Sequence, residues 1–326
     1  MPNTINERYS RQIQLERVGE VGQQKMAQAR VLVIGAGGLS ATLLPILAAS
    51  GVGYLRIYDA DTIELSNLHR QILFRMSDLN HNKAITAQLH LHQLNPNIQI
   101  EAFAEAVDKH NLMQALDNID LVVDAADRFK VTYLLSDVCH QLHIPLVSAS
   151  VLEEHGYVGG FCGQNAPSYR AIFPELPQRL QSCQSAGVLA STVATLASLQ
   201  AHMVLNIILQ QTPSALGQML NLDLASWHLQ SFRFDHAPEP VDLWQWLELS
   251  ELNADDYLIE LRNDIEQPLP VHSNIHRHTL QQLQNNPPHI DRRQRIVCIC
   301  SSGVRAQQAR HILKQHGYTQ IAICSS

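Results

Sequence analysis

The sequence contains few cysteine residues for its length. Its 326 residues include six cysteines, namely Cys139, Cys162, Cys183, Cys298, Cys300 and Cys324. Six cysteines are too few to form the disulfide framework typical of small extracellular proteins. The first residues, MPNTINERYSRQ, are polar and lack the apolar stretch of a secretory signal peptide. We therefore expect a cytoplasmic protein.

The sequence also lacks an excess of basic residues. Its 23 Lys and Arg residues are outnumbered by 30 Asp and Glu residues, which gives a net charge of −7. A mildly acidic chain is not expected to have nucleic acid as its main partner. A long charge-free stretch, residues 180–222, contains glutamine, asparagine and histidine residues that would be costly in lipid. We predict a buried helix there, with small residues that allow close packing across a dimer interface, and no membrane span.

Apolar β-rich runs alternate with helical patterns through the first half of the chain. The patterns predict strands at residues 30–34, 54–58, 97–103, 119–124 and 145–150. They predict helices at residues 6–18, 38–50, 82–94, 108–116, 129–142 and 187–210. Such alternation is typical of α/β proteins with a doubly wound, mostly parallel sheet and helices on both of its faces.

A predicted linker divides the chain into two parts. The segment DHAPEP, residues 235–240, is followed by a second and shorter α/β pattern. There we expect helices near 242–250, 279–285 and 305–316, and strands near 256–260, 295–299 and 319–323. The prediction is two domains, comprising residues 1–236 and 237–326.

A strand, a glycine-rich turn and the start of a helix are predicted for residues 30–47, RVLVIGAGGLSATLLPIL. Gly35 and Gly37 permit a tight turn, and the helix that starts near Gly38 directs its positive end at a phosphate. Position 40, where a dinucleotide fingerprint has its third glycine, holds Ser40. Asp59 ends the next predicted strand and is placed to accept hydrogen bonds from ribose hydroxyls. This Rossmann-like pattern fits NAD and ATP equally well.

Charged residues after Asp59 favour ATP. Arg70 and Lys83 follow it closely, and a triphosphate about to lose pyrophosphate needs several cations. Arg70 as a surface residue and Lys83 as an ordinary helix residue remain the simpler alternatives. Further on, Asp127 in LVVDAADR is placed either to hold Mg²⁺ or to cap a helix.

Together these residues resemble the ubiquitin-activating-enzyme-like family. Within it they are most similar to the bacterial adenylyltransferases that activate sulfur carriers for molybdopterin or thiamine synthesis. The resemblance covers residues 5–235 and rests on RYSRQI, GAGGLS, DADTIELSNLHRQ, Lys83, DAADR and SCQSAGV. It implies a homodimeric enzyme that uses ATP and Mg²⁺ to adenylate a small ubiquitin-like protein ending in Gly-Gly.

The resemblance also implies roles for individual residues. Gly38 would contact phosphate, Asp59 the ribose, and Asp127 the metal, while Arg11 would reach the ATP of the partner subunit. The remaining nucleotide-binding set is Ser66, Asn67, Leu68, His69, Arg70, Lys83 and Arg128. Arg128 departs from the family, which usually has asparagine there.

A structural zinc site of the family is missing from the sequence. The relatives use two C-x-x-C pairs, but this chain has Ser168 and Ala171 at the first place and only His236 as a ligand in DHAPEP. Tetrahedral zinc needs four thiolate or imidazole ligands. We therefore expect a protein that folds without zinc.

Two cysteines are candidates for sulfur chemistry. Cys183 lies in SCQSAGV, where relatives carry a cysteine that attacks the acyl-adenylate or joins the carrier. Cys300 opens the loop CSSGVR, which ends at Arg305 and precedes a helix, so backbone N–H groups can surround its sulfur. This spacing resembles rhodanese sulfurtransferases, although the chain ends without that family's closing segment. The alternatives are a buried structural Cys183 and an inert Cys300 loop.

Two other functions remain open from the sequence. One is an NAD-dependent oxidoreductase. Arg70, Lys83 and the lack of a recognisable set of hydride-transfer residues argue against it. The other is a non-catalytic binding module of the same fold, which Ser40, Arg128 and the missing zinc ligands leave possible.

Overall fold

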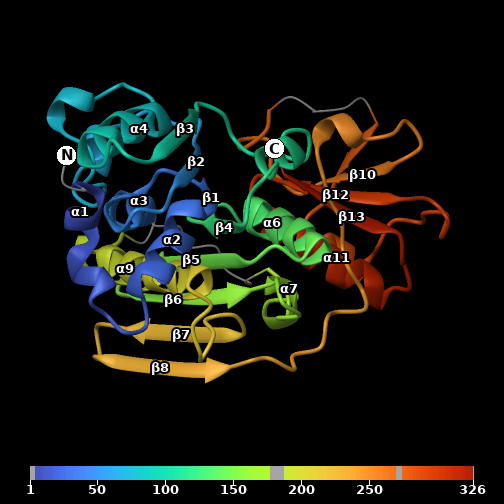
Figure 1. The fold of residues 1–326 in the computed structure, drawn as a ribbon. Coiled ribbons are helices and arrows are strands. Elements are labelled where there is room, and N and C mark those ends of the chain that lie inside the picture. Colours follow the sequence, from blue (N-terminus) through green and yellow to red (C-terminus); the bar gives the residue numbers. More distant parts are fainter. Residues whose placement is uncertain (1–3, 177–186, 269–273, 326) are drawn as a thin grey trace. The chain divides into compact units, whose positions relative to one another are not determined.

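The computed structural model describes residues 4–176, 187–268 and 274–325 (Figure 1). The chain forms two compact units. Unit 1 comprises Met1–Ile172 and Gln181–Glu239, and unit 2 comprises Phe173–Leu180 and Pro240–Ser326. The division after Glu239 lies three residues beyond the predicted boundary. The sequence did not predict that a short segment, Phe173–Leu180, belongs to unit 2.

Unit 1 is built on an eight-stranded sheet with the order β3-β2-β1-β4-β5-β6-β7-β8. The first five strands in this order are parallel, and β6, β7 and β8 continue the sheet in antiparallel fashion. The strands are β1 Arg30–Ile34, β2 Tyr54–Tyr58, β3 Gln99–Phe103, β4 Leu121–Asp124, β5 Leu146–Leu152, β6 His155–Phe161, β7 Gln218–Asp223 and β8 His228–Arg233. The mostly parallel, doubly wound architecture is confirmed, whereas β6 to β8 were not predicted.

The helices of unit 1 follow the predicted alternation with some differences. They are α1 Thr4–Ile13, α2 Gly19–Gln28, α3 Gly38–Ser50, α4 Lys83–Leu94, α5 Leu112–Ala115, α6 Phe129–Leu142, α7 Tyr169–Ile172 and α9 Ala190–Ile208. The helix predicted over 6–18 is present as α1 but ends at Ile13, and α2, which follows after turns, was not predicted. Short 3-10 turns, Leu65–Asn67 and Met76–Asp78, lie between β2 and α4.

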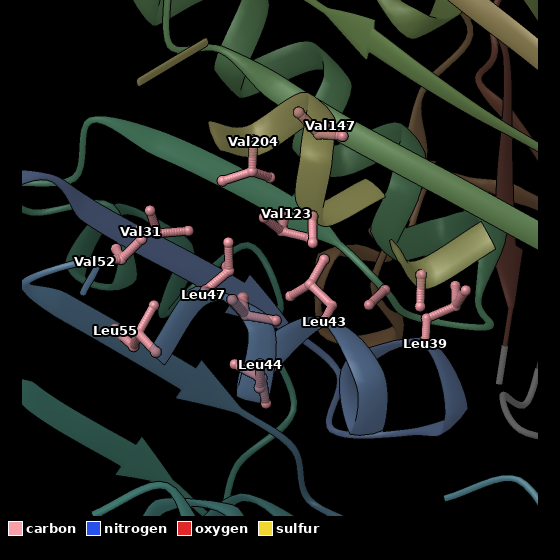
Figure 2. Packing of buried hydrophobic residues seen from close by; sticks show 14 of the residues in the cluster. Val31, Leu39, Leu43, Leu44, Leu47, Val52, Leu55, Val123, Val147 and Val204 are labelled. Atoms are coloured by element: carbon pink, nitrogen blue, oxygen red, sulfur yellow. The ribbon is translucent and has the colours of Figure 1, made fainter. Parts of the chain in front are cut away.

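The core of unit 1 lies between the sheet and helices α3, α4 and α9. Val31 of β1 pairs in register with Leu55 of β2 and with Leu121 of β4. All three side chains join one buried cluster with Leu43 and Leu47 of α3. Figure 2 shows how these leucines of α3 point at the valines of the central strands. This packing fixes the start of α3 beside the carboxyl ends of β1 and β4.

Helix α9 is long and apolar enough to cross a membrane, but half of its most apolar window is buried inside the protein. It packs against α3, β5 and β6. Gln200, fully buried, donates from Nε2 to the backbone carbonyl of Asp124 at 2.8 Å. The predicted buried helix is therefore confirmed, with its polar residue bonded to the end of β4.

Unit 2 is a five-stranded parallel sheet with the order β11-β10-β12-β13-β9. Its strands are β9 Trp246–Leu247, β10 Tyr257–Glu260, β11 Ile275–Arg277, β12 Ile296–Cys300 and β13 Ile321–Ser325, and its helices are α10 Leu280–Asn285 and α11 Val304–Gln315. Val297, Ile299 and Cys324 lie in its apolar core.

The helix predicted near 242–250 is wrong. Trp244 and Trp246 are buried while Leu243 and Gln245 are exposed, so the segment has the two-residue period of a strand. Trp246 pairs with Ile323 of β13, and a short 3-10 turn, Leu249–Glu251, follows it.

Candidate nucleotide site and candidate sulfur site

The glycine loop of unit 1 lies where the sheet order reverses, between β1 and β4. Gly35 has a φ of +94°, and a Cβ atom on it would lie 2.7 Å from the carbonyl oxygen of Ala125. The loops that follow β1 and β4 are therefore in backbone contact. In doubly wound sheets, ligands bind at this switch point. The N-cap residue of α3, Gly37, makes no side-chain cap, which suits a helix start that receives phosphate.

Ser40 supports the glycine loop. Its side chain is buried, and its hydroxyl donates a hydrogen bond to the carbonyl oxygen of Gly35. The hydroxyl thus bonds the first turn of α3 back to the end of β1. The substitution of the third glycine by serine is accommodated through this bond.

Asp59 links the end of β2 to the glycine loop. Its carboxylate accepts the backbone N–H of Ala36 at 2.6 Å through Oδ2 and that of Asp61 at 2.8 Å through Oδ1. Burial raises the pKa of Asp59, and the two N–H donors and Lys83 act in the opposite direction. The carboxylate is fixed beside the loop and keeps lone pairs for further donors such as ribose hydroxyls.

Arg70 reaches the start of α3. Its Cγ and Cδ atoms lie 3.5 Å and 3.6 Å from where a Cβ of Gly38 would be, and its Nη1 donates to the carbonyl oxygen of Ser66 at 3.2 Å. His69 lies beside the same guanidinium, at 2.8 Å from Nε2 to Nη1. Arg70 is thus a partly exposed residue whose side chain adjoins the start of α3. The tightest neighbour of Gly38 is Val193 of α9, whose Cγ1 would lie 3.0 Å from that Cβ.

Asn67 supports the segment that carries Arg70. It is buried at the end of the 3-10 turn, where its Oδ1 accepts the N–H of Glu64 at 3.2 Å and its Nδ2 donates to Ser66 at 3.4 Å. Leu68 is partly buried against the main core. Within this structure, Asn67 and Leu68 position the segment, while Ser66 and His69 are exposed.

Lys83 is buried in the first turn of α4, and its ammonium contacts the Asp61 carboxylate at 2.9 Å. It also interacts electrostatically with Asp59. Asn82 caps the helix and donates from Nδ2 to the carbonyl oxygens of Asp59 and Asp61, at 2.9 Å and 3.1 Å. A buried lysine at a helix start needs such partners, because its charge opposes the helix dipole. The cation is thereby held close to the Asp59 carboxylate.

Asp127 is exposed in the loop after β4 and does not cap α6. The N-cap position is Arg128, whose side chain is exposed and makes no cap hydrogen bond. The capping interpretation of Asp127 is therefore wrong. Within the described ranges, no group of three or more His, Cys, Asp or Glu residues is arranged to hold a metal ion.

A buried carboxylate lies beneath this loop. Asp124 is 1% exposed, accepts the Ser148 hydroxyl at 2.8 Å and accepts the N–H of Ala126 at 3.2 Å. Burial raises its pKa to about 6, with hydrogen bonds from neighbours acting against the shift. Asp124 thus shapes the loop that presents Asp127.

Gln71 was missed as a site residue. It is 3% exposed, and its Nε2 lies 3.9 Å from where a Cβ of Gly37 would be. Its Oε1 has no hydrogen-bond partner within the described part of the chain. A buried amide beside a phosphate loop is a candidate ligand contact. The only sequence signal was its place directly after Arg70.

Arg11 lies away from the glycine loop of its own chain. It is exposed on α1, which is anchored by Tyr9 against Gly51, just past the carboxyl end of α3. The glycine loop lies at the opposite end of that 13-residue helix, about 20 Å away at 1.5 Å per residue. The geometry therefore does not bring Arg11 to the glycine loop within one chain.

Comparison with known proteins identifies the first unit. Residues 9–241 match the ThiF family. The chain belongs to the ThiF family.

Among its relatives is the sulfur carrier protein adenylyltransferase of Thermus thermophilus, 38% identical over 67% of this chain and 83% of that protein. The molybdopterin-synthase adenylyltransferase of Haemophilus influenzae is 34% identical over 69% of this chain and 93% of that protein. The adenylyltransferase and sulfurtransferase MOCS3 of Culex quinquefasciatus is 38% identical, but the match spans only 51% of its length.

Solved structures support the same fold. The structure of E. coli MccB with ATP aligns with a TM-score of 0.62 at 23% identity, covering 74% of each chain. At this identity the likeness shows the Rossmann-like fold of this ThiF-family chain and nothing finer.

The second candidate site is the Cys300 loop of unit 2. Its Sγ accepts the backbone N–H groups of Gly303 at 3.0 Å and of Ala306 at 3.4 Å, between the end of β12 and the start of α11. Arg305 forms a bidentate pair with Glu266, at 2.8 Å and 2.7 Å, and holds the pKa of that carboxyl at about 2. The predicted N–H cradle around the sulfur is thus present.

Cys300 has no exposed surface. Gly303, with a φ of +87°, leaves room for the Trp246 ring, 2.6 Å from where its Cβ would be, and for Leu176 at 3.4 Å. Leu176 belongs to the short segment Phe173–Leu180 of unit 2. A second contact of that segment is the hydrogen bond that Trp244 donates to the carbonyl oxygen of Pro174 at 2.9 Å. The sulfur is therefore buried, and Trp246 and Leu176 pack against Gly303 of the loop that follows it. Cys183 lies outside the described residues.

Proposed function

We propose that unit 1 is an ATP-dependent adenylyltransferase that activates the C-terminal glycine of a small ubiquitin-like sulfur carrier. The observation that carries this proposal is that Arg70 lies against the start of α3 and Lys83 lies near Asp59, whose carboxylate is bonded to the glycine loop. The names of the Thermus and Haemophilus relatives support the same activity. A hydride-transfer enzyme has no need of these cations, so the oxidoreductase alternative is not favoured.

The chemistry is a transfer of AMP. A carboxylate oxygen of the carrier attacks the α-phosphorus of ATP, the bond to the bridging oxygen breaks, and pyrophosphate leaves with that electron pair. Negative charge accumulates on the phosphate oxygens, and fixed cations stabilise it there. Arg70, held by Ser66, and Lys83, held by Asp61, are preorganised for this task.

Asp127 is the side chain that we assign to Mg²⁺. Its carboxylate is exposed on the loop that touches Gly35 and is not used as a helix cap. Oxygen ligands of this kind suit Mg²⁺, which usually keeps one or two carboxylates together with substrate phosphates. The ion would neutralise charge on the phosphates.

Isothermal calorimetry tests nucleotide choice. We expect Mg·ATP to bind and NAD not to bind. Arg70→Ala and Lys83→Ala should each lower the adenylation rate by about 10²–10³-fold. Arg17→Ala is the matched control, because Arg17 is exposed and bonds to Thr212, beyond the far end of α9. Tight NAD binding without ATP binding would overturn the proposal.

We further propose a homodimer in which Arg11 completes the site of the partner subunit. The support is the position of Arg11, which lies near the carboxyl end of α3, whereas the glycine loop of the same chain lies at the start of that helix. Mixing Arg11→Ala protein with Asp127→Ala protein should restore activity, because each heterodimer then holds one intact site. Failure to restore activity after confirmed subunit exchange would refute a contribution in trans.

Unit 2 is proposed to be a rhodanese-like sulfurtransferase domain with Cys300 as the sulfur carrier. The support is geometric: two backbone N–H groups donate to the Cys300 sulfur at the start of α11. In the loading step, the Cys300 thiolate attacks the outer sulfur of a persulfide R–S–SH. The S–S bond breaks, R–S⁻ leaves, and Cys300 keeps the transferred sulfur as S–SH. Incubation with a persulfide donor should add one sulfur by intact mass, and none in Cys300→Ser.

A further inference from the structure

The last residue of unit 1, Glu239, binds the turn that contains Ser168 through its carboxylate. Oε1 of Glu239 accepts the backbone N–H of Ser168 at 2.7 Å, and Oε2 accepts the Ser168 hydroxyl at 2.6 Å. The same hydroxyl oxygen accepts the N–H of Ala171 at 3.2 Å. Ser168 is 3% exposed, so both of its polar groups are satisfied inside the protein.

The turn is attached at a second point to α6. Arg170 forms a bidentate pair with Asp137, at 2.5 Å and 2.9 Å, and its guanidinium lies 4.7 Å from the ring centre of Tyr133. Arg170 is 2% exposed. The position of Ser168 is therefore set by the packing of α6 as well as by Glu239.

The residues at this place do not fit zinc. Ser168 and Ala171, and likewise His236 and Glu239, are three residues apart, which is the spacing of the C-x-x-C pairs that the family resemblance implies. Their side chains are instead a hydroxyl, a methyl group that offers no ligand atom, an imidazole and a carboxylate. The Ser168 hydroxyl keeps its proton and donates it in a hydrogen bond to Glu239, so it is not an anionic zinc ligand.

A nearby cysteine does not complete a zinc site. The buried Cys162 thiol is directed to α6, where its Sγ donates to the carbonyl oxygen of Ser136 at 3.7 Å, and one cysteine with His236 gives fewer than the four ligands of tetrahedral zinc. The part of the chain that the structure describes contains no metal-binding group of three or more His, Cys, Asp or Glu residues.

We propose that Ser168 and Glu239 form a metal-free clasp that does the work of a structural zinc site. The chain leaves unit 1 after Ile172, four residues beyond Ser168, and leaves it again after Glu239. The clasp therefore joins the two places from which the chain passes into unit 2. Sequence reasoning missed Glu239, because it considered only zinc ligands in DHAPEP.

Hydrogen exchange tests the clasp directly. In Glu239→Ala, the N–H of Ser168 loses its acceptor, so the peptide that spans residues 163–172 should exchange at least tenfold faster. Glu239→Gln keeps one acceptor oxygen and should be intermediate. The melting temperature of Glu239→Ala should fall by about 2–6 °C, a modest value because Glu239 is 38% exposed. Glu20→Ala, which removes another exposed carboxylate of unit 1, is the control.

A second variant tests the geometry by restoring thiolates. The protein with Ser168→Cys, Ala171→Cys, His236→Cys and Glu239→Cys should bind one zinc ion per chain and become sensitive to a chelator. The unmodified protein, purified without chelator, should contain no stoichiometric zinc and should melt at the same temperature with and without EDTA. Stoichiometric zinc in the unmodified protein, or unchanged exchange in Glu239→Ala, would overturn the inference.

Discussion

Replacing Gly35 by alanine should damage the fold and the nucleotide site together. Gly35 has a φ of +94°, and an added Cβ would lie 2.7 Å from the Ala125 carbonyl oxygen and 3.2 Å from the Ala126 nitrogen. Both are backbone atoms, so no flexible side chain can move to relieve the contact. The loops after β1 and β4 must separate, and the second of these loops presents Asp127.

The magnitude follows from two costs. A left-handed backbone costs alanine about 1–2 kcal/mol, and overpacking of this kind typically costs about 1–3 kcal/mol. Together they predict a loss of about 2–5 kcal/mol in the free energy of unfolding. For a unit of this size, each kcal/mol lowers the melting temperature by about 2–4 °C. We therefore expect a decrease of about 4–20 °C.

Gly37→Ala is the matched control for Gly35→Ala. Gly37 has a φ of −84°, and an added Cβ would lie 3.9 Å from the Gln71 amide, an ordinary contact. Its melting temperature should stay within about 3 °C of the unmodified protein, because only a small preference for glycine at the N-cap is lost. Thermal unfolding and ATP calorimetry on both variants decide the matter. Equal stability of the two variants would refute the reasoning from loop contact.

Other consequences can be measured on single variants. Burial raises the pKa of Asp124 from 3.8 to about 6, so the folded state binds the proton of this carboxyl more tightly than the unfolded state does. The resulting contribution to the free energy of unfolding is fully present below about pH 4 and is lost as the pH rises to about 6. Asp124→Asn should therefore gain about 2–4 kcal/mol relative to the unmodified protein between these pH values, measured by urea unfolding. A constant difference would contradict it. Leu176→Ala should speed alkylation of Cys300 by iodoacetamide several-fold, since Leu176 packs on Gly303. An unchanged alkylation rate would show that access of the reagent to Cys300 does not depend on Leu176.

Much of the nucleotide half could be predicted because its pattern is local. The run 30–34 is apolar because β1 is buried, and glycines mark the turn that follows it. Helix α3 was predicted at 38–50 and lies there. Two site residues after it lie at element boundaries that a sequence pattern reveals, since Asp59 follows the end of β2 and Lys83 begins α4.

The parts that could not be predicted depend on tertiary contacts. All six residues of β8 are exposed, so the strand has no alternating pattern to detect. Gln71 and Glu239 are common polar residues whose importance comes from what they touch, the glycine loop and the Ser168 turn. The segment Phe173–Leu180 was expected to pack within the first domain, but its partner is unit 2.

Pyrophosphate exchange tests the central claim most directly. Labelled pyrophosphate, ATP and Mg²⁺ are incubated with the protein and a ubiquitin-like carrier ending in Gly-Gly, and label in ATP is counted. The account predicts exchange that requires the carrier, disappears when its last glycine is removed, and falls about 10²–10³-fold in Lys83→Ala. Absence of exchange with every such carrier, from protein that binds NAD tightly instead of ATP, would contradict it.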